Sequence, residues 1–492
     1  MSELTIHQGG ESKVVGFEGT PLLQEVLAQA GIPFDHPCGG RGTCGKCSAE
    51  ITGCVSLPNA SERQAGRRLT CQVRLLGDAQ VWLPEFESHF IEISGRTAAA
   101  HNPMPGAYGV AVDIGTTTLA LKLFELETGK QLAAAGAMNP QRSVAADVMG
   151  RIGAALEGQG AHLQALIQNA MEELLNRACS AARVPREALS VMVVTGNTTM
   201  LYLLTGKNPE CLSHAPFQAD TLFDVHSELL GLPVYYPPCM NAFVGADITC
   251  AVLASRMYLQ SEPALLCDIG TNGEIALWKE GTLYVTSTAA GPAFEGAGIS
   301  CGCGSIPGAI DRVWVENGQI QCHTIQDAPA AGICGSGLID AIAAFLETGV
   351  IDETGAASES ILPLKDGITL SQKDIRAVQL AKAAIRAGMQ TLLETVGISE
   401  DEIPVLYIAG GFGSHLNVDS AMAIGLIPPS MKKHIQVLGN AALSGAAELL
   451  LNQDRLERVR ALAGTASHLD LGGNPQFNEN FCEQILFSEM DL

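Results

Sequence analysis

The stretch YGVAVDIGTT at residues 108–117 has a similar counterpart, ALLCDIGTN, at residues 264–272. In each copy an apolar run of the strand type delivers Asp-Ile-Gly-Thr into a turn. A second apolar run follows each turn, LALKLF at residues 119–124 and EIALW at residues 274–278. The matching strand context makes chance recurrence of the four-residue word the poorer explanation. The repeat predicts two related halves, each with a strand-turn-strand hairpin, within one domain.

Length and composition describe a large, acidic, globular protein. A chain of 492 residues exceeds what one ordinary core holds, so roughly two to four domains are expected. Hydrophobic residues make up 47% and charged residues 16%, which is typical of packed chains and not of disordered ones. The formal net charge of -23 disfavours nucleic acid and anionic membranes as partners.

Targeting signals and cysteine content both bear on the cellular compartment. The first residues show neither a basic leader nor an apolar signal core, and no apolar run approaches the ~20 residues of a membrane span. Fifteen cysteines without a signal peptide favour reduced thiols over a disulfide framework, with some of them as metal ligands. We therefore expect a cytoplasmic protein.

The texture of the chain changes near residue 93. Before it, short strand and helix signals surround a loop rich in cysteine and glycine. A small, proline-bearing and nearly uncharged linker follows, and then apolar strands alternate with amphipathic helices in an α/β pattern. The predicted division is an N-terminal domain at 1–93, a linker at 94–106 and an α/β domain at 107–492, with a first lobe at about 107–260, a second lobe at about 261–440 and a C-terminal helical segment at about 441–492.

The cysteine-rich loop has the spacing of an iron–sulfur site. Residues 38–47 read CGGRGTCGKC, a C-x5-C-x2-C pattern, and Cys71 follows downstream. A [2Fe–2S] cluster needs four thiolates, and the glycines let the loop fold closely over inorganic sulfide. We predict that the cluster ligands are Cys38, Cys44, Cys47 and Cys71.

Two alternatives to this ligand set remain open. Zinc usually takes two C-x2-C knuckles, and here only Cys44 and Cys47 form one. Cys54 is the rival fourth ligand, but it lies close after Cys47, whereas Cys71 is expected on the next strand, arriving from the opposite side. The spacing is one residue longer than the plant type and resembles that of ferredoxins of the adrenodoxin type and those that serve ring oxygenases. That resemblance implies a β-grasp domain.

The two Asp-Ile-Gly-Thr hairpins resemble the phosphate-binding hairpins of the superfamily of sugar kinases, heat-shock chaperones and actin. The resemblance implies that ATP phosphates bind between the hairpins and that Asp113 and Asp268 hold Mg²⁺ through water. Asp247 and Glu274 are candidates for the general base. The implied phosphate-binding residues are Gly115, Thr116, Thr117 and Thr118 in the first hairpin and Gly270, Thr271, Asn272 and Gly273 in the second.

A third motif lies downstream of both hairpins. Residues 406–414, LYIAGGFGS, form a predicted strand and glycine turn that resembles the adenosine-binding motif of the same superfamily. The implied contacts with ribose and base are Gly410, Gly411, Phe412 and Gly413. No G-x-x-x-x-G-K-[ST] occurs, so a P-loop is excluded. The implied fold is a two-lobed α/β actin-like ATPase domain.

The two modules together resemble the reductive activators of corrinoid proteins. Strings rich in Gly, Asn and Thr extend this resemblance over nearly the whole chain, at residues 195–200, 244–247, 291–299, 307–310 and 332–340. The resemblance implies ATP-dependent transfer of one electron from the cluster to Co(II), which regenerates Co(I) for methyl transfer. The corrinoid must be presented by a partner protein, because the D-x-H-x-x-G pattern of corrinoid proteins is absent here.

The sequence leaves several points open. The low-potential electron donor is unidentified, and a homodimer is neither required nor excluded. Cys301 and Cys303 fit either small packed residues near the cleft or a functional pair that is redox-active or holds a labile metal. The alternative functions are an ATP-dependent activator of a radical dehydratase and a small-molecule kinase with a regulatory iron–sulfur cluster.

Overall fold

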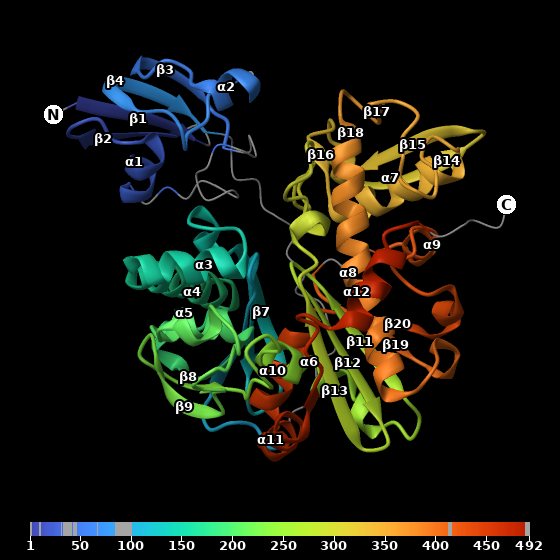
Figure 1. Ribbon diagram of the computed structural model, residues 1–492. Helices are drawn as coiled ribbons and strands as arrows, with labels where there is room; N and C mark the ends of the chain where they lie inside the picture. The colour runs from blue at the N-terminus through green and yellow to red at the C-terminus, as the bar shows by residue number, and fades with distance from the viewer. Residues whose placement is uncertain are drawn as a thin grey trace.

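The chain forms an N-terminal unit and two larger lobes (Figure 1). A computed structural model describes residues 2–8, 11–30, 32, 42, 47–65, 67–83, 101–411 and 416–487. This arrangement confirms the predicted fold class, a small N-terminal α+β domain followed by a two-lobed α/β domain. Among the described residues, no helix combines the length and apolar character needed to cross a bilayer.

The N-terminal unit is a sheet of order β2-β1-β4-β3 packed against α1. Strand β1 is parallel to β4 and antiparallel to β2. Alternation buries Leu4 and Ile6 of β1, while a helical spacing buries Leu23, Val26 and Leu27 of α1 against the same face. The elements are β1 Ser2–Gln8, β2 Glu11–Phe17, α1 Leu23–Gln29, β3 Glu50–Val55, α2 Ala60–Ala65 and β4 Leu75–Trp82.

The position predicted for Cys71 on a strand is wrong. Cys71 lies in a turn before β4, where the N–H groups of Gln72 and Val73 both donate to the carbonyl of Leu69. The adjacent Thr70 N–H donates to the carbonyl of Cys47 at 2.8 Å. The turn prevails over extended pairing because it satisfies these backbone groups locally.

The first lobe is built on a sheet of order β7-β6-β5-β8-β10-β9. Helices α3, α4 and α5 lie beside this sheet (Figure 1). Apolar residues of α4 and α5 fill the core between these helices and the sheet. The elements are β5 Tyr108–Ile114, β6 Thr118–Glu125, β7 Lys130–Met138, α3 Val148–Ala154, α4 Gly160–Ala182, β8 Leu189–Gly196, α5 Thr198–Thr205, β9 Val225–Leu229 and β10 Leu232–Tyr236.

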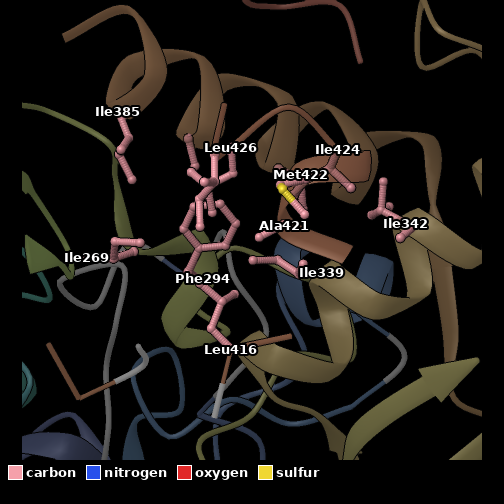
Figure 2. Packing of buried hydrophobic residues seen from close by; sticks show 14 of the residues in the cluster. Ile269, Phe294, Ile339, Ile342, Ile385, Leu416, Ala421, Met422, Ile424 and Leu426 are labelled. Carbon is pink, nitrogen blue, oxygen red and sulfur yellow. The ribbon is translucent and has the colours of Figure 1, made fainter. Parts of the chain in front are cut away.

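The second lobe repeats this plan with the order β20-β19-β11-β12-β13-β21 and carries an additional small sheet of order β15-β14-β16. Phe294 packs with residues of α7, α8 and α9 in its core (Figure 2). The elements are β11 Ala264–Ile269, β12 Gly273–Lys279, β13 Thr282–Thr288, β14 Ala309–Glu316, β15 Gln319–Thr324, β16 Gly332–Ile333, α7 Gly335–Glu347, β17 Ile361–Pro363, β18 Thr369–Ser371, α8 Gln372–Val396, β19 Leu406–Ala409, α9 Val418–Ala423 and β20 Ile435–Gly439.

The predicted sequence repeat is visible in the strand pairing. In the first lobe β5 pairs antiparallel with β6 and parallel with β8. In the second lobe β11 pairs antiparallel with β12 and parallel with β19. The two Asp-Ile-Gly-Thr turns therefore occupy the same place in two equivalent sheets.

Helices α6 (Ala246–Ser255) and α10 (Ala441–Leu451) join the lobes. They belong to one apolar cluster that includes β5 and β6 of the first sheet and β11, β12 and β13 of the second. The chain after α10 serves both lobes, because α11 (Leu456–Thr465) joins this cluster, β21 (Ser467–His468) pairs with β13, and α12 (Pro475–Glu483) lies along α8 (Figure 1).

The described end of the predicted linker is fixed to α10. The Met104 N–H donates to the carbonyl of Leu450 at 2.8 Å, and the Met104 side chain is buried. Asn102 Nδ2 donates to Asp454 Oδ1 at 2.8 Å. The chain therefore enters the first lobe from a position anchored between the lobes.

Replacing Gly445 of α10 should destabilise the junction between the lobes. A Cβ at this position would lie 2.0 Å from the carbonyl oxygen of Cys250 in α6, so Gly445→Ala must push two buried helices apart. We expect a loss of about 1–3 kcal/mol in the free energy of unfolding.

Gly464→Ala in α11 is the matched control, because a Cβ there meets nothing within 4 Å. Alanine is the better helix former, so this variant should gain up to about 1 kcal/mol. Urea unfolding of both variants measures the difference, and equal midpoints would contradict close packing of α6 on α10.

Candidate functional site

The two hairpins face one cavity of about 410 Å³ between the lobes. At the first turn the Gly115 N–H donates to the Thr118 carbonyl at 2.9 Å, and at the second the Gly270 N–H donates to the Asn272 carbonyl at 3.0 Å. These bonds close both turns tightly and direct their residues into the cavity. Of the twelve residues that the sequence singled out as catalytic or phosphate-binding, eleven line the cavity and Gly273 does not. The eleven are Asp113, Gly115, Thr116, Thr117, Thr118, Asp268, Gly270, Thr271, Asn272 and Glu274 from the hairpins, and Asp247 from α6.

Gly273 instead packs behind the second turn. A Cβ at this position would lie 2.7 Å from the Ile385 side chain of α8 and 2.8 Å from Thr288 Oγ1. Its predicted place among the phosphate-binding residues therefore differs from its observed place at the start of β12, where it lets α8 approach the strand.

Four carboxylates gather at this cavity and repel one another. Burial raises the pKa of Asp113 to about 6, partly offset by a hydrogen bond from Asn440. Burial and the charge of Asp113 raise the pKa of Asp268 to about 7. Burial and the charges of Asp113 and Asp268 raise the pKa of Asp247 to about 8. The pKa of Glu274 is also well above its usual range, through burial and the charges of Asp247 and Asp268.

The four carboxylates do not by themselves form a closed chelate for a cation. Among the described residues, no group of three or more His, Cys, Asp or Glu side chains is close enough to enclose a metal ion. Hard divalent cations such as magnesium keep several waters and use one or two carboxylates together with phosphate oxygens. Mutually repelling, buried carboxylates at a distance from one another suit that mode of binding.

Helix starts converge on the same cavity and favour an anion there. Helices α5, α6, α7 and α10 begin at its wall, with lining residues Asn197, Asp247, Gly335 and Ala442 in or next to their first turns. The free N–H groups and partial positive charge of a helix start attract phosphate. Arg142 is the one cationic side chain among the described residues of this wall.

Several residues that support the hairpins were missed by the sequence reasoning. Asn440 Nδ2 donates to Asp113 Oδ2 at 2.9 Å, and Asn139 Nδ2 donates to the Gly115 carbonyl at 2.8 Å. The buried Arg151 donates from Nη2 to the Thr116 carbonyl at 2.6 Å. Asn197, which lies in the string at residues 195–200 singled out from the sequence, donates from Nδ2 to Thr116 Oγ1 at 3.0 Å. An asparagine directly after a strand, as in Gly439-Asn440, was the available signal for the first of these.

The predicted adenosine motif reaches the cavity through its first two glycines. Gly410 and Gly411 follow β19 and line the wall. Gly410 has φ +101°, and a Cβ there would lie 2.6 Å from the Ile269 carbonyl oxygen, so only glycine fits against the second hairpin. Phe412 and Gly413 lie outside the described residues.

In the N-terminal unit, Cys47 and Cys71 form a buried thiol pair. Their Sγ atoms are 3.1 Å apart and each residue is 1% exposed. The hydrogen bond with Cys71, followed by burial, raises the pKa of the Cys47 thiol. Cys54, the rival ligand, is exposed on β3, where its Sγ lies beside Gly77. Cys38 and Cys44 lie outside the described residues.

The other cysteine pair singled out from the sequence, Cys301 and Cys303, lies near the cavity between the lobes. Cys303 and Cys334 line the wall, and Cys301, two residues before Cys303, is partly buried. A Cβ on Gly332 would lie 2.6 Å from Cys303 Sγ, so this thiol packs directly on the backbone of β16. This contact favours the packing interpretation of Cys303.

The fold and the two sites define a class: an ATP-binding, actin-like protein joined to a [2Fe–2S] ferredoxin. Three family profiles match consecutive parts of the chain. They are the 2Fe-2S iron-sulfur cluster binding domain at residues 6–76, the RACo middle region at 108–260 and the C-terminal domain of RACo, the ASKHA domain, at 262–492.

Full-length relatives give the family. The chain is 33% identical to the corrinoid activation enzyme RamQ of Eubacterium limosum over 95% of this chain and 96% of the relative. It is 30% identical to the [Co(II) methylated amine-specific corrinoid protein] reductase of Methanosarcina barkeri over 76% of each chain. A solved reductive activator for a corrinoid, iron-sulfur protein matches with a TM-score of 0.71 and 26% identity, over 99% of this chain and 98% of that one.

The chain belongs to the family of reductive activators of corrinoid proteins. The predicted family, fold class and enzyme class, an ATP-dependent reductase, are thereby confirmed. The [2Fe–2S] cluster and ATP are confirmed as ligands of its two modules.

Replacing Cys71 and Cys54 separately should identify the fourth cluster ligand. Because Cys71 Sγ lies against Cys47 Sγ in a buried site, Cys71→Ser should remove nearly all visible absorbance and acid-labile sulfide. Cys54→Ser should leave both unchanged, since Cys54 is exposed. The reverse outcome would make Cys54 the ligand.

The carboxylate cluster should make the metal-free chain less stable as pH rises. The folded-state pKa values of about 6, 7 and 8 for Asp113, Asp268 and Asp247 exceed the ordinary 3.8, so the folded state binds protons more tightly than the unfolded state. The stabilisation is complete below pH 3.8 and is lost as pH rises through those three values. Urea midpoints measured with a chelator should fall from about pH 5 to about pH 9.

Asp247→Asn should flatten this dependence and raise the stability of the metal-free chain near pH 8.5 by on the order of 1–3 kcal/mol. Asp401→Asn, an exposed aspartate outside the cavity, is the matched control and should change neither quantity. A native midpoint that is independent of pH across this range would contradict the repulsion.

Proposed function

We propose that the chain uses ATP to drive one electron from its [2Fe–2S] cluster to the Co(II) form of a corrinoid protein, which regenerates Co(I). One observation supports this proposal above all. The same chain contains a buried Cys47–Cys71 thiol pair and a cavity lined by two hairpins that resemble phosphate-binding hairpins. The names of the full-length relatives support the same substrate class.

In this proposal the N-terminal unit holds the electron carrier. Cys38, Cys44, Cys47 and Cys71 provide the four thiolates, and the cluster supplies a one-electron couple. The thiol pair fits the group, since its two buried sulfurs lie 3.1 Å apart and cysteine sulfurs are the ligands that such clusters take. The turn at residues 69–73 keeps the two sulfurs together.

The hairpins hold the nucleotide. Gly115, Thr116, Thr117 and Thr118 on one side, and Gly270, Thr271 and Asn272 on the other, donate N–H and hydroxyl groups to the phosphates, while Gly273 lets the second turn pack on α8. Gly410, Gly411, Phe412 and Gly413 leave room for ribose and base.

The carboxylates of this site would hold Mg²⁺, which would supply positive charge to neutralise the phosphates. Asp113 and Asp268 would hold the ion through water, and Asp247 and Glu274 would add negative charge around it. Four buried carboxylates with raised pKa values fit a divalent cation, because its charge relieves their repulsion.

Coupling follows from the position of the hairpins on separate lobes. Phosphates that bind both turns draw the two sheets together around α6 and α10. Closure then changes the surface offered to the corrinoid protein and the geometry of electron transfer. In the domain division that we propose, residues 1–93 are the electron carrier, 94–106 connect it, and 107–492 are the two-lobed ATPase.

The proposed setting is the cytoplasm, with a low-potential one-electron donor that recharges the cluster between turnovers. The formal charge of -23 supports protein partners over nucleic acid or anionic membranes.

An anaerobic assay tests the function directly. Reduced protein and ATP are mixed with a Co(II) corrinoid protein, and the absorbance of Co(I) is followed. Asp113→Ala should lower ATP-dependent Co(I) formation by on the order of 10²-fold, because it removes an orienting carboxylate, and should leave the visible spectrum of the cluster intact.

Asp401→Ala serves as the exposed control and should retain native rates. Co(I) that forms at the same rate without ATP would contradict the proposed coupling of ATP hydrolysis to electron transfer. An ATPase that needs a small-molecule substrate and ignores corrinoid proteins would favour the kinase alternative.

A further inference from the structure

A carboxylate from a third element joins the two hairpins. Glu295 ends the short helix η6 (Pro292–Glu295), and its side chain lines the cavity. Thr117 Oγ1 of the first hairpin donates to Glu295 Oε2 at 2.6 Å. Thr271 Oγ1 of the second hairpin lies 2.9 Å from both Glu295 oxygens, and the two threonine oxygens are 3.4 Å apart. One carboxylate therefore contacts both halves of the phosphate site.

The position of Glu295 is fixed by its neighbours. Phe294 is 1% exposed and packs in the core of the second lobe near Ile269 and Leu416 (Figure 2). The Gly296 N–H donates to the Ala293 carbonyl at 3.0 Å and closes the turn behind Glu295. A side chain anchored on a rigid element in this way can be placed reproducibly against a reacting group.

Glu295 is separate from the four-carboxylate cluster. Its two oxygens contact threonine hydroxyls at the turns, those of Thr117 and Thr271. The charge of Glu295 acts on Arg151, whose pKa it raises against the larger effect of burial. Arg151 holds the Thr116 carbonyl of the first turn. Glu295 thus contacts the turns of the two hairpins and is not one of the four clustered carboxylates.

This separation bears on which carboxylate can accept a proton. A carboxylate that neutralises a bound cation is a weak proton acceptor, since the cation stabilises its charged form. Asp247 and Glu274, the two candidates from the sequence, both belong to the four-carboxylate cluster. Glu295 lies outside that cluster and beside the two hydroxyls that would donate to phosphate.

We propose that Glu295 is the general base for ATP hydrolysis. The inference rests on the proposed function, in which the phosphates enter between the hairpins and take over the Thr117 and Thr271 hydroxyls. The released carboxylate oxygens then accept a hydrogen bond from a water molecule beside the γ-phosphate.

The reaction follows from that position. The oxygen of the water forms a bond to the γ-phosphorus while one of its protons moves to Glu295. The bond from this phosphorus to the bridging oxygen of the β-phosphate breaks, and ADP leaves with the electron pair. Glu295 returns its proton to the phosphate product or to solvent, so the carboxylate is regenerated.

Glu295→Gln tests this role, since glutamine keeps the size and one acceptor oxygen but is not a base. We expect the kcat of ATP hydrolysis by the cluster-loaded full chain to fall about 10²–10⁴-fold. The Kd for ATP, measured by calorimetry, should stay within about threefold, because binding does not need the base. Glu316→Gln on β14, which is exposed and outside the cavity, should match the native chain in both quantities.

Glu295→Ala with added formate separates a base from a positioning residue. Formate can accept the proton in the space left by the side chain, so it should restore part of the lost kcat. A Glu295→Gln variant with kcat within about threefold of native would overturn the inference. So would a parallel loss of ATP binding without rescue by formate. Native chain that binds no ATP would instead overturn the proposed function.

Discussion

Four carboxylates buried between two β-hairpins repel one another, and much of the architecture serves to hold them there. Asp113 and Asp268 end equivalent strands of the two sheets, Asp247 begins α6, and Glu274 lies at the start of β12. Keeping like charges in a poorly solvated site is unfavourable unless a cation or a proton neutralises them. The hydrogen bond from Asn440 to Asp113 offsets only part of this cost. The arrangement is therefore poised to gain free energy when phosphate and a divalent cation arrive together.

This gain in free energy can change the arrangement of the lobes, because the carboxylates belong to different lobes. Helices α6 and α10 are packed so closely that only glycine fits at position 445, and they form a common core with both sheets. The C-terminal segment adds to this junction through α11, which packs in the same apolar cluster. Its later elements belong to the second lobe, where β21 extends the sheet and α12 lies on α8. In the proposed function, closure around a nucleotide moves the two lobes about this apolar junction and changes the surface offered to the corrinoid protein.

The sequence predicted the parts of this picture that depend on local pattern. The repeated Asp-Ile-Gly-Thr hairpins predicted the two lobes, and the cysteine spacing predicted the iron–sulfur module. Both predictions were possible because turn geometry and ligand spacing depend on neighbouring residues. Cys71 was expected on a strand and lies in a turn, since satisfied backbone hydrogen bonds near Leu69 decided its conformation. Gly273 was expected at the phosphates and instead admits α8.

Contacts between distant segments were beyond reach from the sequence. Asn440 meets Asp113 across 327 positions, and Glu295 meets Thr117 across 178. Neither pair has a local signature, because only the packing of the two lobes brings the partners together. The buried Arg151 was missed for the same reason, although it supports the first turn.

In the proposed function, nucleotide turnover in the cavity drives electron delivery from the N-terminal module. The most direct measurement is the amount of Co(I) formed when reduced protein receives excess Co(II) corrinoid protein and a limiting amount of ATP under anaerobic conditions, with ADP counted in the same sample. Co(I) should rise in proportion to the ATP supplied and stop rising when ATP is exhausted. Co(I) that keeps accumulating after the last ATP is consumed, or an ADP yield unrelated to Co(I), would contradict this coupling.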